Sequence, residues 1–342
     1  MNKIKIIINK LYEKKDLSID ESIFVFNEIM SGKVSEIFIS SFLTALKIKG
    51  ETFEEILGAT KILRKKSTKI NSPKNTVDTC GTGGDMIGTL NISTASALVA
   101  SSVGVKVAKH GNRSVSSSSG SADVLAEAGA NIELEPTIVA HSIRETGVGF
   151  MFAPAHHRAT RYAVGPRREL GIRTLFNVLG PLTNPAGARM QLVGVFDRHW
   201  QTIVVEALAR LGTERALVVN AKDGLDELSI SSITTVAELC DGRITWFEVD
   251  PKEFGIEIRD RSSIVASDAE HSLKIIRKVF DNEPGPARDI VALNGGAAIY
   301  ICGLADTIAG GVERANQVLA EGSARDRFNH FIEFTKRHRR AP

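Results

Sequence analysis

Two clusters of residues in this chain have the types and spacing to bind a phosphorylated ligand. Gly81-Thr82-Gly83-Gly84-Asp85 leaves its backbone N–H groups uncovered, which lets an anion approach closely. Further along, Lys109-His110-Gly111-Asn112-Arg113-Ser114 gathers cationic and amide donors. The glycine-rich segment alone also fits a plain tight turn, because it is neither a dinucleotide-binding nor a P-loop fingerprint. Together the clusters predict a phosphate site.

Between these clusters lies Asn91-Ile92-Ser93-Thr94, at the expected start of a helix. A helix N-terminus attracts anions through its unpaired N–H groups and its positive dipole end. The same hydroxyl groups would also suit a hard metal ion. A second interpretation is that Ser93 or Thr94 caps the helix, and the two roles are compatible.

A third element is the acidic turn Asp223-Gly224-Leu225-Asp226-Glu227, which follows a predicted strand. Adjacent carboxylates suit Mg²⁺, which commonly binds a few carboxylates together with substrate phosphates. Arg167 could hold a carboxylate through two hydrogen bonds. His156-His157 lacks further ligands at zinc-site spacing, so zinc is not expected.

The composition narrows the class of protein. A net charge of +3 is too small to indicate nucleic-acid or membrane binding, and no apolar run is long enough to span a membrane. The three cysteines are widely spaced and suggest no disulfide framework. We therefore expect a cytoplasmic protein.

The elements that must position these residues follow from sequence periodicity. Residues 1–70 predict helices with buried stripes, the first opened by a capping box at Ser18 and Glu21. Strand and helix signals then alternate, predicting an α/β domain with a mainly parallel sheet. We expect a discontinuous helical domain at 1–70 and 136–184, and the α/β domain at 71–135 and 185–342. Strands are expected near 76–78, 105–108, 192–196, 216–219 and 245–249, with helices after about residue 267.

These motifs resemble anthranilate phosphoribosyltransferase. The resemblance includes Asn177-Val178-Leu179-Gly180-Pro181-Leu182-Thr183-Asn184-Pro185 and runs from about residue 4 to beyond residue 320. It implies transfer of the phosphoribosyl group of phosphoribosyl pyrophosphate (PRPP) to anthranilate, in tryptophan biosynthesis. It also implies Mg²⁺ as cofactor and a homodimer formed through the helical parts.

The resemblance assigns roles residue by residue. Lys109 and His110 would be catalytic, although no general base is identified. Ser93, Asp226 and Glu227 would hold Mg²⁺, while Gly81, Asn112, His157 and Arg167 would bind anthranilate. The residues that would contact PRPP are Gly81, Gly84, Asp85, Thr89, Asn91, Ile92, Ser93, Thr94, Lys109, Gly111, Asn112, Arg113, Ser117 and Ser121. The last two belong to the serine-rich segment 116–121, which we expect to form a mobile loop that closes over the ligand.

Some positions depart from the family pattern: Met86-Ile87 and Arg158 stand where the family usually has Gly and Pro. Two other functions remain open at this point. A pyrimidine nucleoside phosphorylase would share the fold but lacks the Lys109–Arg113 motif. A non-enzymatic nucleic-acid-binding relative would need a broad basic face and a binding affinity that falls steeply with salt.

Overall fold

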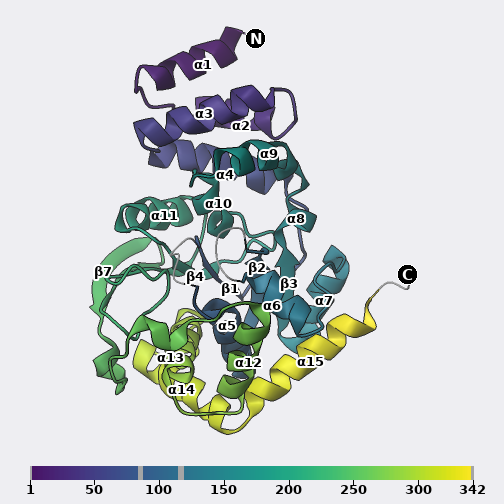
Figure 1. Cartoon of the computed structure of the whole chain (residues 1–342), viewed down its shortest axis with the longest axis vertical. Helices are drawn as coiled ribbons and strands as arrows, with labels where there is room; N and C mark the ends of the chain where they lie inside the picture. The colour runs from purple at the N-terminus through teal and green to yellow at the C-terminus, as the bar shows by residue number, and fades with distance from the viewer. Residues whose placement is uncertain (1, 84–87, 115–118, 340–342) are drawn as a thin grey trace.

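The computed structural model describes residues 2–83, 88–114 and 119–339. Its N-terminal part is helical, as predicted (Figure 1). The capping box is confirmed: Ser18 Oγ accepts from the backbone N–H of Glu21, and Glu21 Oε2 accepts from that of Ser18. The helices of this bundle are α1 (Asn2–Tyr12), α2 (Ile19–Ile29), α3 (Glu36–Lys49) and α4 (Phe53–Lys66).

A seven-stranded sheet follows, with the strand order β3-β2-β1-β4-β5-β6-β7. The pairs from β3 to β5 are parallel and the last two are antiparallel, which confirms a mainly parallel sheet. The strands are β1 (Thr76–Gly81), β2 (Lys106–Gly111), β3 (Val148–Phe152), β4 (Met190–Gly194), β5 (Arg215–Ala221), β6 (Thr234–Cys240) and β7 (Arg243–Val249).

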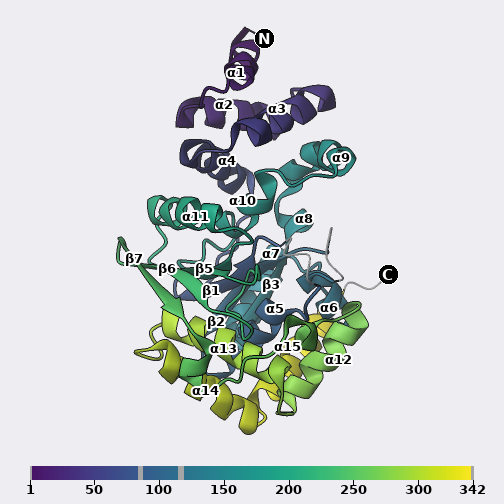
Figure 2. The same ribbon diagram turned by 60° about the vertical axis from the view of Figure 1, so that its left-hand side comes forward.

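Alternate residues of the central strands enter two different cores. Leu192 and Leu217 face the core shared with the C-terminal helices, whereas Val193 and Val218 face the core that continues into the helical bundle. This follows from the two-residue period of a strand. Figures 1 and 2 show the sheet between these two helical layers. The helices that complete the second domain are α5 (Ile92–Ser102), α6 (Ser121–Glu127), α7 (Pro136–Thr146), α11 (Arg198–Arg210), α12 (Ala269–Phe280), α13 (Pro286–Ile301), α14 (Ile308–Ala320) and α15 (Ser323–Arg337).

The expected second helical segment, 136–184, is divided in the structure. Val148–Phe152 pairs with β2 and is an edge strand of the sheet, so it does not belong to the helical domain. Its five residues are all buried, and a short continuous apolar run gives no periodicity that separates a strand from a helix. Only the later part of the segment joins the core of the bundle, through Ala163, Phe176 and Leu179, whereas α7 packs beside β2 and β3. The helices after β3 are α8 (Ala153–His156), α9 (Arg161–Leu170) and α10 (Phe176–Leu182).

Candidate active site

Several of the predicted site residues that the structure describes lie at one edge of the sheet. Because β1, β2, β4 and β5 are parallel, their carboxyl ends lie at the same edge. Gly81 ends β1, Gly111 ends β2, and the acidic turn 223–227 begins just after β5. Lys109 and His110 lie within β2 rather than in the loop beyond it. The topology therefore brings together motifs far apart in the sequence.

Two glycines at this edge make room for the acidic turn. A Cβ added to Gly81 would lie 2.3 Å from Asp226 Oδ2, and one added to Gly194 would lie 1.4 Å from the Asp226 carbonyl oxygen. Gly81 and Gly194 are also neighbours in the sheet. This close approach lets Asp226 Oδ2 accept a 2.8 Å hydrogen bond from the backbone N–H of Gly83. The acidic turn is thus joined directly to the glycine-rich segment.

The rest of the turn is held by its own side chains and by α13. Asp223 Oδ1 accepts from the N–H of Leu225, and Asp223 Oδ2 accepts from the Ser229 hydroxyl. Asn294 of α13 accepts from the N–H of Leu228 and donates to its carbonyl oxygen. These contacts hold Asp226 and Glu227 at the site with only 8% of each residue exposed.

The oxygen atoms here fit a magnesium site that is completed by substrate. Within the described ranges, no group of three or more His, Cys, Asp or Glu side chains could hold a metal ion. Mg²⁺, however, usually takes one or two carboxylates and fills its other positions with water and substrate phosphates. The carboxylates of Asp226 and Glu227 and the hydroxyl of Ser93 are hard ligands of this kind.

Lys109 is almost fully buried, with 3% of the residue exposed. Its ammonium donates to the carbonyl oxygen of Thr79 at 2.6 Å and to Ser93 Oγ at 3.0 Å. Burial lowers the pKa of Lys109, and the negative charge of Asp78 opposes that change. The sequence predicted a cationic donor, and the structure ties it to the start of α5.

The start of α5 corrects one of the two interpretations of its hydroxyl groups. The helix begins at Ile92, so Asn91 is the N-cap residue, and neither Ser93 nor Thr94 caps the helix. The Asn91 side chain makes no capping hydrogen bond. Asn91 Oδ1 and Thr94 Oγ1 are buried without a partner among the described residues. Buried polar atoms of this kind call for a hydrogen-bonding partner such as a ligand or water.

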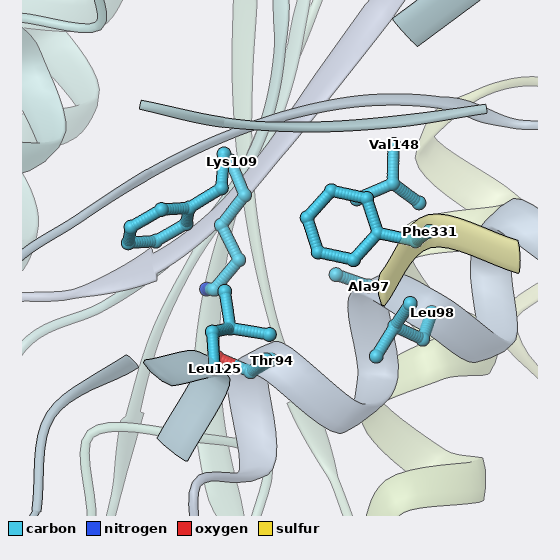
Figure 3. A pocket seen from close by; sticks show the side chains of 8 residues that line it. Thr94, Ala97, Leu98, Lys109, Leu125, Val148 and Phe331 are labelled. Carbon is cyan, nitrogen blue, oxygen red and sulfur yellow. The ribbon is translucent and has the colours of Figure 1, made fainter. Parts of the chain in front are cut away.

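Behind this helix start, Thr94 and Lys109 line a cavity of about 10 Å³ whose other walls are apolar (Figure 3). It has room for one water molecule at most, so it is part of the support of the site and not a substrate pocket. Phe331 of α15 forms one of its walls.

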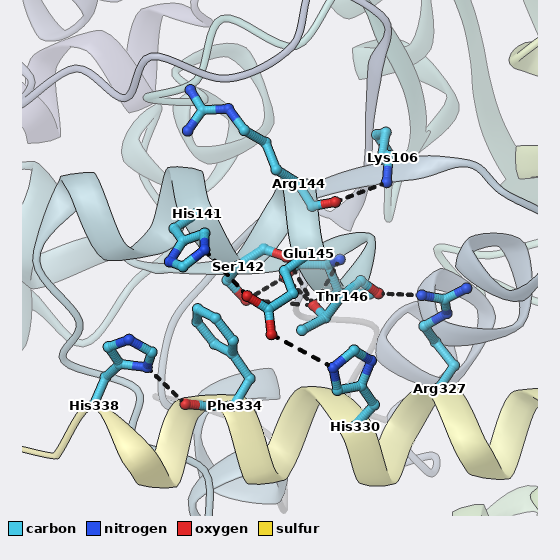
Figure 4. Close-up of polar contacts among 11 residues, drawn as sticks. Lys106, His141, Ser142, Arg144, Glu145, Thr146, Arg327, His330, Phe334 and His338 are labelled. Carbon is cyan, nitrogen blue, oxygen red and sulfur yellow. Dashed lines mark hydrogen bonds and ion pairs between the residues drawn. The ribbon is translucent and has the colours of Figure 1, made fainter.

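Polar contacts join the helix α15 to α7 (Figure 4). Arg327 donates to the carbonyl oxygen of Thr146 at the end of α7, where a cation is favoured by the helix dipole. Glu145 of α7 lies 3.1 Å from His141 Nε2 and 3.8 Å from His330 Nε2. The C-terminal helix is thereby fixed to α7, which packs against β2 and β3.

Two histidines meet on the side of the site that faces the helical bundle. The rings of His110 and His157 are 5.0 Å apart, and both residues are buried. Burial lowers the pKa of His157 to about 4 and moves the pKa of His110 well below its usual value. Both imidazoles are therefore neutral near pH 7. The Nε2 atoms of both rings lack a partner among the described residues.

Arg167 and Asn112 differ in how tightly they are held. Arg167 lies on α9 with its guanidinium 5.0 Å from the centre of the Phe176 ring, and burial lowers its pKa. Asn112 is exposed just after β2, and its Oδ1 accepts from the N–H of Arg113. Arg113 forms a 2.9 Å ion pair with Asp123.

Asp123, which no sequence motif singled out, lies beside the predicted site. Its Oδ2 accepts 2.9 Å hydrogen bonds from the N–H groups of Ser114, before the serine-rich segment, and of Gly120, near the end of that segment. Burial raises the pKa of Asp123, but these two hydrogen bonds and Arg113 more than offset it, so the pKa is lowered. Its position three residues after Gly120, as in a capping box, was the available signal.

The remaining predicted residues fall into two groups. Thr89 pairs with Val265, and the adjacent Leu90 donates to Ile264, so this segment is anchored to the chain after β7. Ser121 starts α6, and a Cβ on Gly111 would lie 2.1 Å from its Oγ. The other group lies outside the described residues: Gly84, Asp85 and Ser117, together with Met86 and the middle of the expected loop.

Comparison with known proteins bears on both domains. Residues 5–67 match the helical bundle domain of a glycosyl transferase family, and residues 73–325 match the a/b domain of that family. The chain is 50% identical over 329 residues to the anthranilate phosphoribosyltransferase of Thioalkalivibrio sulfidiphilus, covering 96% of this chain and 97% of that protein. It is 52% identical over 320 residues to the Methylococcus capsulatus protein of the same name, covering 93% and 94%.

Solved structures agree with these matches. The anthranilate phosphoribosyltransferase of Thermus thermophilus is 37% identical with a TM-score of 0.91, covering 96% of this chain and 99% of that one. The Saccharomyces cerevisiae enzyme in complex with PRPP and Mg is 26% identical with a TM-score of 0.89, covering 98% of each chain. These matches extend over nearly the whole chain, and the motifs around Gly81, Lys109 and Asp226 lie at one sheet edge. They show that the chain belongs to the anthranilate phosphoribosyltransferase family.

Proposed function

We propose that this chain transfers the phosphoribosyl group of PRPP to the amine of anthranilate, releasing pyrophosphate and N-(5-phosphoribosyl)anthranilate for tryptophan biosynthesis. The observation that carries the proposal is the meeting of three groups at one sheet edge. These are the buried ammonium of Lys109, the acidic pair Asp226 and Glu227, and the start of α5 with its unpartnered polar atoms. A cation, metal-binding carboxylates and a helix N-terminus suit a polyphosphate with a bound metal.

PRPP would lie across the carboxyl ends of β1 and β2. Among the described residues, the Lys109 ammonium bonds to Thr79 and Ser93, and its third N–H group would donate to a phosphate oxygen. Asn91 and Thr94 supply further polar groups. The other residues proposed to contact PRPP are Gly81, Gly84, Asp85, Thr89, Ile92, Ser93, Gly111, Asn112, Arg113, Ser117 and Ser121.

Ser93, Asp226 and Glu227 would hold Mg²⁺. When bound, the ion would neutralise negative charge that develops on the departing pyrophosphate. The Lys109 ammonium would also neutralise this charge. It is held in position before the reaction and lies in a buried site, where its charge acts strongly.

Anthranilate would lie on the side facing the helical bundle, near Gly81, Asn112, His157 and Arg167. Arg167 can bind its carboxylate through two parallel hydrogen bonds. His110 and His157 are neutral and give this side a polar but uncharged wall. The amine of anthranilate already carries a lone pair, so holding it close to the anomeric carbon is the main requirement.

The test is the loss of anthranilate fluorescence when purified protein is mixed with PRPP and Mg²⁺. Loss that requires protein, PRPP and Mg²⁺ together supports the proposal, and chromatography should identify phosphoribosylanthranilate and pyrophosphate. No loss with folded protein rejects the proposal. Phosphorolysis of pyrimidine nucleosides and salt-dependent nucleic-acid binding would then be measured.

Removing one carboxylate should reveal the metal site. Glu227→Gln keeps the shape of the side chain but removes a negative ligand, so a higher Mg²⁺ concentration should be needed for half-maximal rate, by roughly tenfold. A Mg²⁺ titration of the rate checks this, with Glu248→Gln at the exposed sheet edge as the control. An unchanged titration curve would remove Glu227 from the metal site.

Loss of the Asp123 contacts should weaken the binding of PRPP and leave the binding of anthranilate unchanged. Asp123→Ala removes the acceptor shared by Ser114 and Gly120, so these two positions lose the side chain that connects them. We expect KM for PRPP to rise by roughly tenfold with KM for anthranilate nearly constant. Steady-state kinetics with each substrate varied tests this. Equal changes in both KM values would contradict it.

We also propose a homodimer formed through the helical bundle. Ile37 and Ile48 of α3 are 79% and 70% exposed, and Ile6 and Tyr12 of α1 are exposed as well. Residues 37 and 48 lie on one face of α3, and exposed apolar side chains on one face of a helix are a feature of protein–protein interfaces. The double variant Ile37→Lys and Ile48→Lys should shift the protein to monomer in analytical ultracentrifugation. Trp246→Lys, on the exposed face of β7, should not.

In the described part of the chain, no helix has both the length and the apolar character needed to cross a membrane. All three cysteines are free thiols. Free thiols are typical of a reducing compartment, which supports our proposal of a cytoplasmic location.

A further inference from the structure

The sheet separates at the edge where the site lies. Pairing of β1 with β2 includes Thr76 with Lys106 and Val77 with Val107, and goes no further within the described residues. The neighbouring pairs continue, however: β1 with β4 as far as Gly81, and β2 with β3 as far as Gly111. The last residues of β1 and β2 are therefore not paired with each other, which leaves a gap in an otherwise continuous sheet.

The gap leaves backbone groups without a partner strand. In β2, the N–H of Val107 points toward β3, where it bonds to Gly147. Because backbone groups alternate in direction along a strand, those of Ala108 and His110 point toward β1. By the same alternation, the carbonyl of Thr79 points toward β2. Buried backbone groups of this kind must find other partners.

Side chains supply those partners. Asn184 Nδ2 donates to the carbonyl oxygen of Ala108 at 2.9 Å, and Asp78 Oδ1 accepts from the N–H of His110 at 3.1 Å. Asn184 Nδ2 also donates to Asp78 Oδ2 at 2.7 Å. The carbonyl of Thr79 receives Lys109 Nζ. Asp78 and Asn184 are buried, at 0% and 2% exposed.

We propose that Asp78 and Asn184 are positioning residues that replace the missing β1–β2 ladder and so hold Lys109 and His110 in place for the transfer reaction. This inference rests on the proposed function. Neither side chain needs to touch substrate. The Asn184 Oδ1 atom accepts from the N–H of Ala186, which joins the same network to the segment that leads from α10 to β4.

Loss of this network would leave buried peptide groups without partners. With Asn184 shortened to alanine, the Ala108 carbonyl and one oxygen of Asp78 would be left buried without their donor, which is unfavourable. The two strand ends could regain partners by closing toward each other or by admitting water. Either movement displaces the β2 backbone that carries Lys109 from its position beside Ser93.

The test compares three proteins at a temperature where all are folded, as judged by circular dichroism. Asn184→Ala is expected to raise KM for PRPP at least fivefold and to lower kcat at least tenfold. The control Gln201→Ala also removes a buried amide that donates to backbone carbonyls, those of Val218 and Thr235, but between β5 and β6 and away from the gap. Its KM for PRPP should stay within twofold of the wild-type value.

The pattern of the kinetic constants distinguishes positioning from general destabilisation. Loss of folded protein lowers kcat and leaves both KM values unchanged, and that result for Asn184→Ala would overturn the inference. A wild-type protein without turnover would instead reject the proposed function, and this inference with it.

A second pair of variants applies where Asn184→Ala does not fold. Asn184→Asp keeps the size of the side chain but replaces the donor to the Ala108 carbonyl and Asp78 Oδ2 with an acceptor, and Gln201→Glu makes the same change at the control position. Asn184→Asp should have a KM for PRPP at least fivefold higher than that of Gln201→Glu. Equal KM values in the two proteins would overturn the inference.

Discussion

Replacing Lys109 with methionine is expected to lower kcat/KM for PRPP by roughly a hundredfold to a thousandfold, the loss typical of removing one preorganised electrostatic group. Methionine preserves most of the length and apolar volume of the side chain but removes the ammonium. The Thr79 carbonyl and the Ser93 hydroxyl would lose their donor. The departing pyrophosphate would lose a charge that is positioned before the reaction.

A matched control lies on the same strand. Lys106 also donates to a backbone carbonyl, that of Arg144, but at the other end of β2 and at the protein surface. Lys106→Met should therefore keep kcat/KM for PRPP within about twofold. Steady-state kinetics with PRPP varied measures both variants. Similar losses in the two would mean that Lys109 acts through the stability of β2 and not through the substrate.

Acidification should destabilise the fold through the histidine pair. His157 has a pKa of about 4 in the folded protein, against about 6.5 in an unfolded chain. Between these values the unfolded state binds more protons, so the free energy of unfolding falls as pH decreases through this window. At pH 5, compared with pH 7.5, His157 alone should account for a loss of about 2 kcal/mol. His110 acts in the same direction, because burial lowers its pKa as well.

Urea unfolding at pH 5 and pH 7.5, for the wild type and for His157→Asn, isolates this contribution. The wild type should lose about 2 kcal/mol more than the variant over this range, since asparagine does not titrate. Exposed His141, replaced by asparagine, provides the control because its ring is half exposed on α7. Parallel pH dependences in the wild type and His157→Asn would show that His157 is not held neutral by burial.

Much of the fold was predictable because its signals are local. Capping residues and apolar stripes predicted the N-terminal helices, and β1, β2, β4, β5 and β7 were predicted from short apolar runs beside turn residues. The two missed strands differ from these. β3 is continuously apolar, and β6 pairs only with antiparallel neighbours at the far side of the sheet. Their assignment depends on partners that are distant in sequence.

For the candidate site, the motifs alone specify which residue types are present and which family they resemble. Lys109, Ser93 and the acidic pair were identified from motifs, and the structure brings these segments to one edge. The roles of Gly84, Asp85 and Ser117 stay predictions, because these residues lie outside the described part of the chain.

The support of the site depends on contacts between segments that are distant in the sequence. The hydrogen bond from Asn184 to Asp78 spans 106 positions, and that from Gly83 to Asp226 spans 143. Neither contact has a periodic or local pattern, because each depends on where parallel strands end and on how closely glycines let the chain approach. Asp78, Asp123 and Asn184 therefore acquire their roles from the packing of the sheet. A motif specifies the chemistry of a side chain, whereas the backbone groups that it satisfies are known only once the chain is folded.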